Sequence, residues 1–202
     1  YGGTGDATSP TRAAATEAYR EYVPRYPGRP GGGINQAFTV GRVRFVMTDT
    51  RAARDPADDP SGEFRSTLGA QQRAWLLGEI ARADRYGLVV WVNPDPWVAA
   101  ASPGSDSWAG FAEERQVIAD AIAEHGVDNL LMVSGDAHML AFDDGTNTDY
   151  SASQDAGFPL FHVAAVDRRP NVKGGPYSGP VIPGGGQFGT IDYGTGSTPE
   201  AL

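Results

Sequence analysis

The chain has 202 residues, 40% of them hydrophobic, and a formal net charge of -9 at neutral pH. This length and composition suit one globular domain or a large part of one. The negative charge, without a cluster of Lys or Arg, argues against an extended nucleic-acid-binding surface. No apolar run approaches the roughly 20 residues of a membrane span. Because cysteine is absent, disulfides and thiolate metal sites are excluded.

Helices and strands are predicted to alternate along the first two thirds of the chain. Apolar residues at three- and four-residue spacing predict helices over Thr11–Val23, Leu68–Arg85 (with Thr67 as N-cap) and Phe111–His125. Strands are predicted over Phe38–Thr48, over Leu88–Val92 and before Ser134. This order indicates an α/β fold with a largely parallel sheet. The later candidates Met139–Phe142, Phe161–Val166 and Gln187–Tyr193 suggest antiparallel additions.

Polar side chains follow three of the predicted strands. The pairs are Asp49/Arg51, Asn93/Asp95 and Asp136/His138. Ligands of open α/β sheets bind outside the carboxyl ends of the strands. If these strands are parallel neighbours, we expect the three pairs to converge on one edge of the sheet.

Asp136 and His138 are the strongest candidate metal ligands. Alternate residues of an extended segment point the same way, so the carboxylate and the imidazole can address one ion. An oxygen and a nitrogen ligand together suit iron, manganese or zinc better than magnesium. The structural alternative is that Asp136 caps a turn and His138 is an interior histidine.

The other polar motifs have structural explanations. We expect His125, at a helix end, and His162, inside a strand, to be structural. Residues 143–149 (DDGTNTD) favour a hairpin turn over a loose calcium site, since the EF-hand spacing is missing. The run 173–177 (KGGPY) is either a turn or a backbone contact to phosphate. Without a Cys nucleophile, a G-x-S-x-G elbow or a Walker loop, metal-assisted hydrolysis remains the favoured chemistry.

Several segments, in this order, resemble one known family. They are GRVRFVMTDTRAARDP, LGAQQRAWLLGEI, SDSWAGF, VDNLLMVSGDAHM, GGPYSGP and QFGTIDY. Together they resemble the PhoD-like alkaline phosphatases of the calcineurin-like metallophosphoesterase superfamily, over nearly the whole chain.

The resemblance implies a four-layer αββα sandwich with a metal centre at the strand ends. Residues 1–202 would be roughly its C-terminal half, the C-terminal part of a single catalytic domain. The implied activity is hydrolysis of phosphate monoesters or diesters by a metal-activated water. The implied metals are iron and calcium, with zinc or manganese as alternatives. A secreted, periplasmic or cell-surface location is also implied, although no signal peptide is visible.

The resemblance also implies roles for individual residues. Asp136 and His138 would bind metal, and His138 could instead protonate the leaving group. Arg51, Asn93 and Trp108 would approach the substrate, with the alternative that Arg51 and Trp108 only pair and pack. The earlier acidic and histidine motifs of the family are absent and would precede Tyr1. We therefore expect the rest of the domain to supply the remaining ligands.

Two other functions remain open from the residues alone. One is a non-catalytic α/β binding module, or an inactive fragment with an incomplete metal site. The other is a different hydrolase that acts on carboxylic or sugar esters without these metals.

Overall fold

The computed structural model describes residues 5–26, 33–56, 64–163 and 165–194. The strands in these ranges are β1 (Gln36–Val40), β2 (Val43–Met47), β3 (Leu88–Asn93), β4 (Leu130–Ser134), β5 (Met139–Asp143), β6 (Leu160–His162) and β7 (Ile182–Pro183). The helices are α1 (Arg12–Tyr22), α2 (Gly69–Ile80) and α3 (Ala112–Glu124), with short 3-10 turns η1 (Ala83–Arg85) and η2 (Trp108–Phe111). Among these residues, no helix has the length and apolar character that a membrane span needs.

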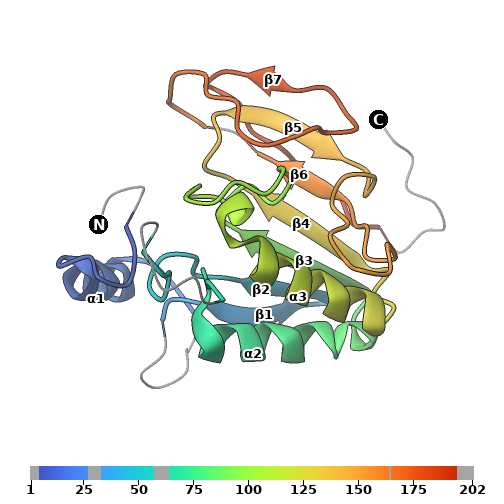
Figure 1. The fold of residues 1–202 in the computed structure, drawn as a ribbon, viewed down its shortest axis with the longest axis horizontal. Coiled ribbons are helices and arrows are strands. Elements are labelled where there is room, and N and C mark those ends of the chain that lie inside the picture. Colours follow the sequence, from blue (N-terminus) through green and yellow to red (C-terminus); the bar gives the residue numbers. More distant parts are fainter. Residues whose placement is uncertain (1–4, 27–32, 57–63, 164, 195–202) are drawn as a thin grey trace.

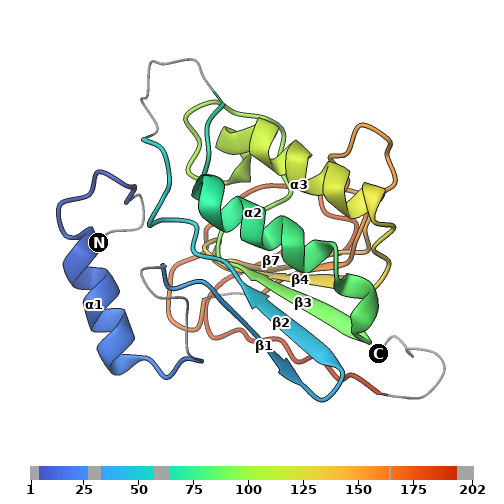
Figure 2. The ribbon, with the colours of Figure 1, turned by 90° about the horizontal axis from the view of Figure 1, so that it is seen from below.

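The strands form one mixed sheet in the order β1-β2-β3-β4-β6-β5-β7 (Figure 1). Strands β2, β3, β4 and β6 are parallel, whereas β1, β5 and β7 pair antiparallel with their neighbours. Helices α2 and α3 are the crossovers between the central strands, and both cover the same face of the sheet (Figure 2). The predicted α/β class is confirmed, and the described residues form a partial α/β sandwich.

The core lies between this helix layer and the sheet. Val46, Trp91 and Met132 form one row across the three central strands. They pack in one buried cluster with Leu76 of α2 and Ile118 of α3. Burying such side chains gives roughly 1.5–3 kcal/mol each, so this layer contact holds the central strands in register.

Three of the predicted strands differ from the structure, and one of them, Phe161–Val166, corresponds to the shorter β6 (Leu160–His162). The segment Phe38–Thr48 is not one strand, because the chain reverses at Gly41, where φ is 58°. A residue without a Cβ allows that conformation, and the apolar alternation simply continues on both sides of the turn. The predicted strand Gln187–Tyr193 is not formed, and β7 occupies the edge beside β5 instead.

The start of α2 also differs from the prediction. Thr67 is not the N-cap, because its hydroxyl donates to the carbonyl of Thr50. The Ser66 hydroxyl instead accepts a hydrogen bond from the Gly69 N–H at 2.7 Å. The regular helix ends at Ile80, and a separate 3-10 turn continues to Arg85.

A buried carboxylate from α3 joins this helix start to the neighbouring helix. Glu114 has no exposed surface and accepts hydrogen bonds from the backbone N–H groups of Thr67 (2.6 Å) and Leu68 (3.3 Å). It also accepts from the Ser66 hydroxyl and pairs with Arg73 at 3.1 Å. The N–H groups that open a helix carry partial positive charge, so an anion there is stabilised.

Glu114→Ala is therefore expected to destabilise the fold by about 3–5 kcal/mol, because it leaves buried donors and a cation without their partner. Glu113→Ala, at the exposed neighbouring position of the same helical turn, is the control and should change stability by less than about 0.5 kcal/mol. Urea unfolding measures both, and equal losses would contradict this role.

Candidate functional site

The predicted convergence of strand ends is present. Strands β2, β3 and β4 are parallel neighbours, so the segments after them lie along one edge of the sheet. Arg51, beyond β2, donates to Asp95, beyond β3, with 2.9 Å between Nη2 and Oδ1. Arg54 binds the other oxygen of the same carboxylate. Sequence analysis missed Arg54, although it lies three residues after Arg51.

The backbone carbonyl of Asp95 extends this connection to the third strand end. It accepts hydrogen bonds from Asn93 Nδ2 at 2.8 Å and from the Ser134 hydroxyl, at the end of β4, at 2.9 Å. Burial raises the pKa of the Asp95 carboxyl, and the adjacent charges of Arg54 and Arg51 oppose that change. One residue thus ties together the ends of β2, β3 and β4.

Asn93 and Trp108 are buried beneath this edge, with 0% and 1% of their surface exposed. The indole N–H of Trp108 donates to Asn93 Oδ1 at 3.0 Å. Trp108 also packs edge-on against Trp97 and Trp91, with ring centroids 5.1 and 6.2 Å away. Both side chains therefore support the loop that carries Asp95.

Asp136 lies in a strained turn immediately after β4. Its φ is 70°, and the Ala137 N–H donates to the Gly135 carbonyl at 2.9 Å across it. This is a γ-turn of the rare type with a positive φ at its central residue. A non-glycine residue in such a conformation costs roughly 1–3 kcal/mol, and strain of this kind gathers at functional sites.

His138 is held by the C-terminal part of the chain. Its Nδ1 lies 2.7 Å from the carbonyl oxygen of Arg169, and its backbone N–H donates to Asn171 at 2.8 Å. Because a carbonyl only accepts, Nδ1 carries the proton and Nε2 keeps the lone pair that a ligand needs. Fixing one ring nitrogen in this way is how proteins orient metal-binding histidines.

Lys173 provides the positive charge beside Asp136. Its ammonium lies 2.8 Å from Asp136 Oδ2 and 3.6 Å from Asp106 Oδ2. Burial alone would lower the pKa of Lys173, but its hydrogen bond to Asp136 and the charge of that carboxylate outweigh this and raise it. The sequence suggested either a turn or a backbone contact to phosphate here, so this ion pair was missed.

Asp136 and His138 fit a metal ion by residue type, since a carboxylate oxygen and an imidazole nitrogen are suitable donors. Within the described ranges, however, no group of three or more His, Cys, Asp or Glu side chains gathers in a way that could hold a metal ion. Asp136 and His138 alone therefore do not make up a complete set of metal ligands.

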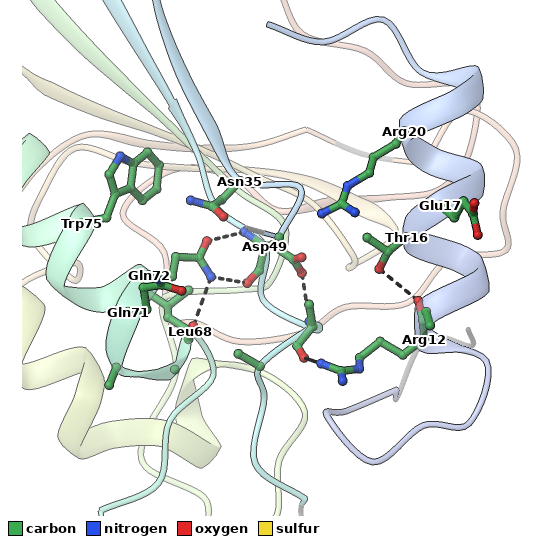
Figure 3. Close-up of a pocket in the computed structure, with 16 residues that line it drawn as sticks. Arg12, Thr16, Glu17, Arg20, Asn35, Asp49, Leu68, Gln71, Gln72 and Trp75 are labelled. Atoms are coloured by element: carbon green, nitrogen blue, oxygen red, sulfur yellow. Dashed lines mark hydrogen bonds between the residues drawn. The ribbon is translucent and has the colours of Figure 1, made fainter. Parts of the chain in front are cut away.

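A large cavity lies elsewhere, beside α1 (Figure 3). It has a volume of about 1070 Å³ and is lined by Arg12 and Arg20 of α1 and by Asp49, Gln72 and Trp75 on the other side. Gln72 bonds both the N–H and the carbonyl of Asp49, at 2.8 and 2.7 Å. None of the five predicted site residues lines this cavity. Its volume favours the cavity as the functional site, whereas the donor atoms of Asp136 and His138 and the backbone strain at Asp136 favour the strand ends.

The acidic loop after β5 forms a turn, as its sequence favoured. Asp143 is fully buried and accepts from the N–H groups of Gly145, Asn147 and Ser178, at 2.9–3.0 Å, and from the Asn147 amide at 2.8 Å. Its oxygens already serve as hydrogen-bond acceptors, which accounts for the carboxylate without a calcium ion.

His162 is buried at the end of β6, with 1% of its surface exposed. Its Nε2 lies 3.2 Å from the carbonyl oxygen of Ala137, between Asp136 and His138. Burial lowers the pKa of His162 to about 4, while the Ala137 hydrogen bond and Asp136 oppose that change and Lys173 adds to it. The ring is therefore neutral at physiological pH.

The strain at Asp136 can be tested with two substitutions that remove the same carboxylate. Asp136→Gly should be more stable than Asp136→Ala by about 1–2 kcal/mol, because glycine adopts a positive φ without a Cβ clash. Thermal unfolding of both variants measures the difference. Equal stability would contradict a strained turn.

The buried neutral ring of His162 makes stability depend on pH. The unfolded chain takes up a proton below about pH 6.5, whereas the folded chain resists it until about pH 4, so this contribution to stability is lost as the pH falls between those values. Lowering the pH from 7 to 5 should cost the native chain about 2 kcal/mol more than it costs His162→Gln. Urea unfolding at the two pH values tests this, and identical losses would contradict it.

Comparisons with known proteins agree on one family. A solved structure of PhoD matches with a TM-score of 0.57 and 24% identity, covering 74% of this chain and 33% of that one, which supports the fold. Alkaline phosphatase D of Bacillus subtilis (strain 168) is 28% identical over 148 residues, which are 63% of this chain and 25% of that protein. The chain thus spans about a quarter of the length of this curated relative.

The sequence model of the family described as PhoD-like phosphatase matches residues 2–173, and this range includes each of the predicted site residues. Because the match covers most of the chain, this protein belongs to the PhoD-like phosphatase family.

Proposed function

We propose that this chain is part of a metal-dependent hydrolase of phosphate esters and that Asp136 and His138 bind the metal. The observation that carries the proposal is the strained turn at Asp136 beside a histidine whose ring is fixed through Nδ1. Family membership supports the reaction class. A preceding part of the same domain would supply the remaining ligands.

The metal ions would be iron and calcium, as the family resemblance implies, with zinc or manganese as alternatives. When bound, such ions lower the pKa of a water and offset negative charge on a phosphate. Asp136 and His138 would hold them through a carboxylate oxygen and Nε2. The alternative role of His138 is to protonate the leaving group, which would require a proton on Nε2.

Arg51 is suited to contact the phosphate. One end of its guanidinium is paired with Asp95, and Nη1 at the other end is buried without a hydrogen-bond partner among the described residues. A guanidinium oriented by one carboxylate offers its remaining N–H groups to a second anion. Asn93 and Trp108, already bonded to each other, would act by holding the Asp95 loop in place.

Lys173 lies where its positive charge pairs with the Asp136 carboxylate, so a cation is favoured beside that side chain. With Asp136 holding a metal ion, the ammonium of Lys173 would be available to pair with the phosphate of a bound ester. Monoesters and diesters are both candidate substrates. A secreted, periplasmic or cell-surface location is proposed from the family resemblance alone.

The alternative of an inactive fragment or binding module also has a supporting observation, since the described residues hold only part of a metal-binding set. If a chain extended to the length of the relatives hydrolyses phosphate esters and the 202 residues alone do not, the inactive-fragment alternative and the proposed hydrolase are both correct for their respective lengths of chain. Turnover that a strong chelator leaves unchanged would favour an ester hydrolase without metal.

His138→Ala, made in the extended protein, should lower the hydrolysis of phosphate esters about 100-fold or more, because both proposed roles of the ring are lost. The control is His125→Ala, at the exposed C-terminus of α3. Turnover of p-nitrophenyl phosphate and of its diester measures the effect. Unchanged turnover and metal content in His138→Ala would refute the assignment.

A further inference from the structure

The connection between β4 and β5 crosses the end of another strand. Because the sheet order is β4-β6-β5, residues 135–138 must pass over the carboxyl end of β6. His162 is the last residue of β6 and lies between Ser134 of β4 and Ala141 of β5. The crossing therefore brings His162 directly under the segment that carries Asp136 and His138.

His162 contacts this segment at its centre. Its Nε2 is 3.2 Å from the carbonyl oxygen of Ala137, and a carbonyl requires a donor, so Nε2 carries the proton. The other nitrogen, Nδ1, is buried and has no hydrogen-bond partner among the described residues. Leaving a buried acceptor unpaired costs free energy, so a residue that served packing alone would be better apolar.

The segment needs such support because it is strained. A γ-turn with a positive φ at Asp136 persists only where its surroundings fix the backbone on both sides. On one side, His138 is paired with Asn171 of the C-terminal segment. His162 reaches the Ala137 carbonyl on this same side, while on the other side Ser134 is held by the Val163 N–H and the Asp95 carbonyl.

We propose that His162 is a positioning residue for Asp136 and His138, holding the Ala137 carbonyl so that both side chains face one ion. This inference rests on the proposed metal-binding function. Outer partners of metal ligands typically change metal affinity 10- to 100-fold when they are removed. His162 would act in the same way, through the backbone between two ligands.

The test uses the protein extended to the length of its relatives, with Mn²⁺ as the probe. His162→Leu removes the donor and should weaken Mn²⁺ binding, measured by calorimetry, 10- to 100-fold. His162→Gln places an amide N–H near the position of Nε2 and should restore most of the affinity. His125→Gln, at an exposed helix end, is the matched control and should bind as the native protein does.

A second readout separates positioning from general stability. Amide hydrogen exchange of the peptide covering residues 134–139 should be faster in His162→Leu than in the native protein, while exchange in α2 and α3 is unchanged. Native Mn²⁺ affinity and native exchange in His162→Leu would overturn the inference. If His162→Leu does not fold, His162→Asn replaces it, because its shorter amide does not reach the Ala137 carbonyl.

Failure of the proposed function has a different signature. A native extended protein that neither binds Mn²⁺ nor hydrolyses phosphate esters would refute that function. The exchange comparison would still decide whether His162 fixes the turn. Tight Mn²⁺ binding that is insensitive to residue 162 would refute the positioning role alone.

Discussion

The arrangement of the site depends on one buried residue, Asp95. Its carboxylate binds Arg51 and Arg54 from the loop after β2, and its carbonyl binds Asn93 of β3 and Ser134 of β4. The buried Asp95 carboxylate, the buried Arg54 and the half-buried Arg51 are costly to desolvate, so each needs the others in place. Loss of this carboxylate would therefore release the loop after β2, whereas the hydrogen bonds to the Asp95 carbonyl would still link the ends of β3 and β4. The sheet supplies the common edge, and Asp95 fixes the loops on it.

The second constraint is the strain at Asp136. The positive φ of Asp136 is retained at this edge because contacts from several parts of the chain hold the residue in place. Lys173 pairs with its carboxylate, Asn171 pairs with His138, and His162 reaches the carbonyl between them. Most of these contacts come from residues beyond β5, far along the chain. The C-terminal segment therefore takes part in building the proposed metal site as well as extending the sheet.

Much of the fold and part of the site could be predicted from the sequence. Apolar spacing identified the crossover helices and central strands, because each buries one face against a single layer. The turn at Gly41 was missed, since a two-residue reversal preserves the apolar alternation. The contacts of Arg54, Lys173 and His162 could not be predicted, because they depend on the sheet order. A strand was predicted at Phe161–Val166, but nothing in the sequence indicates that the three residues of β6 enter between β4 and β5.

The most direct test of metal binding at Asp136 and His138 is to measure the metal content per mole of protein before and after a strong chelator. Two proteins are compared, the 202-residue chain and the chain extended to the length of its relatives. We expect the extended chain to hold tightly bound metal that only the chelator removes, and the shorter chain to hold little. Two donors from residues 136 and 138 are too few to retain an ion against dilution. An extended chain that is purified without metal and cannot take it up would contradict metal binding at Asp136 and His138.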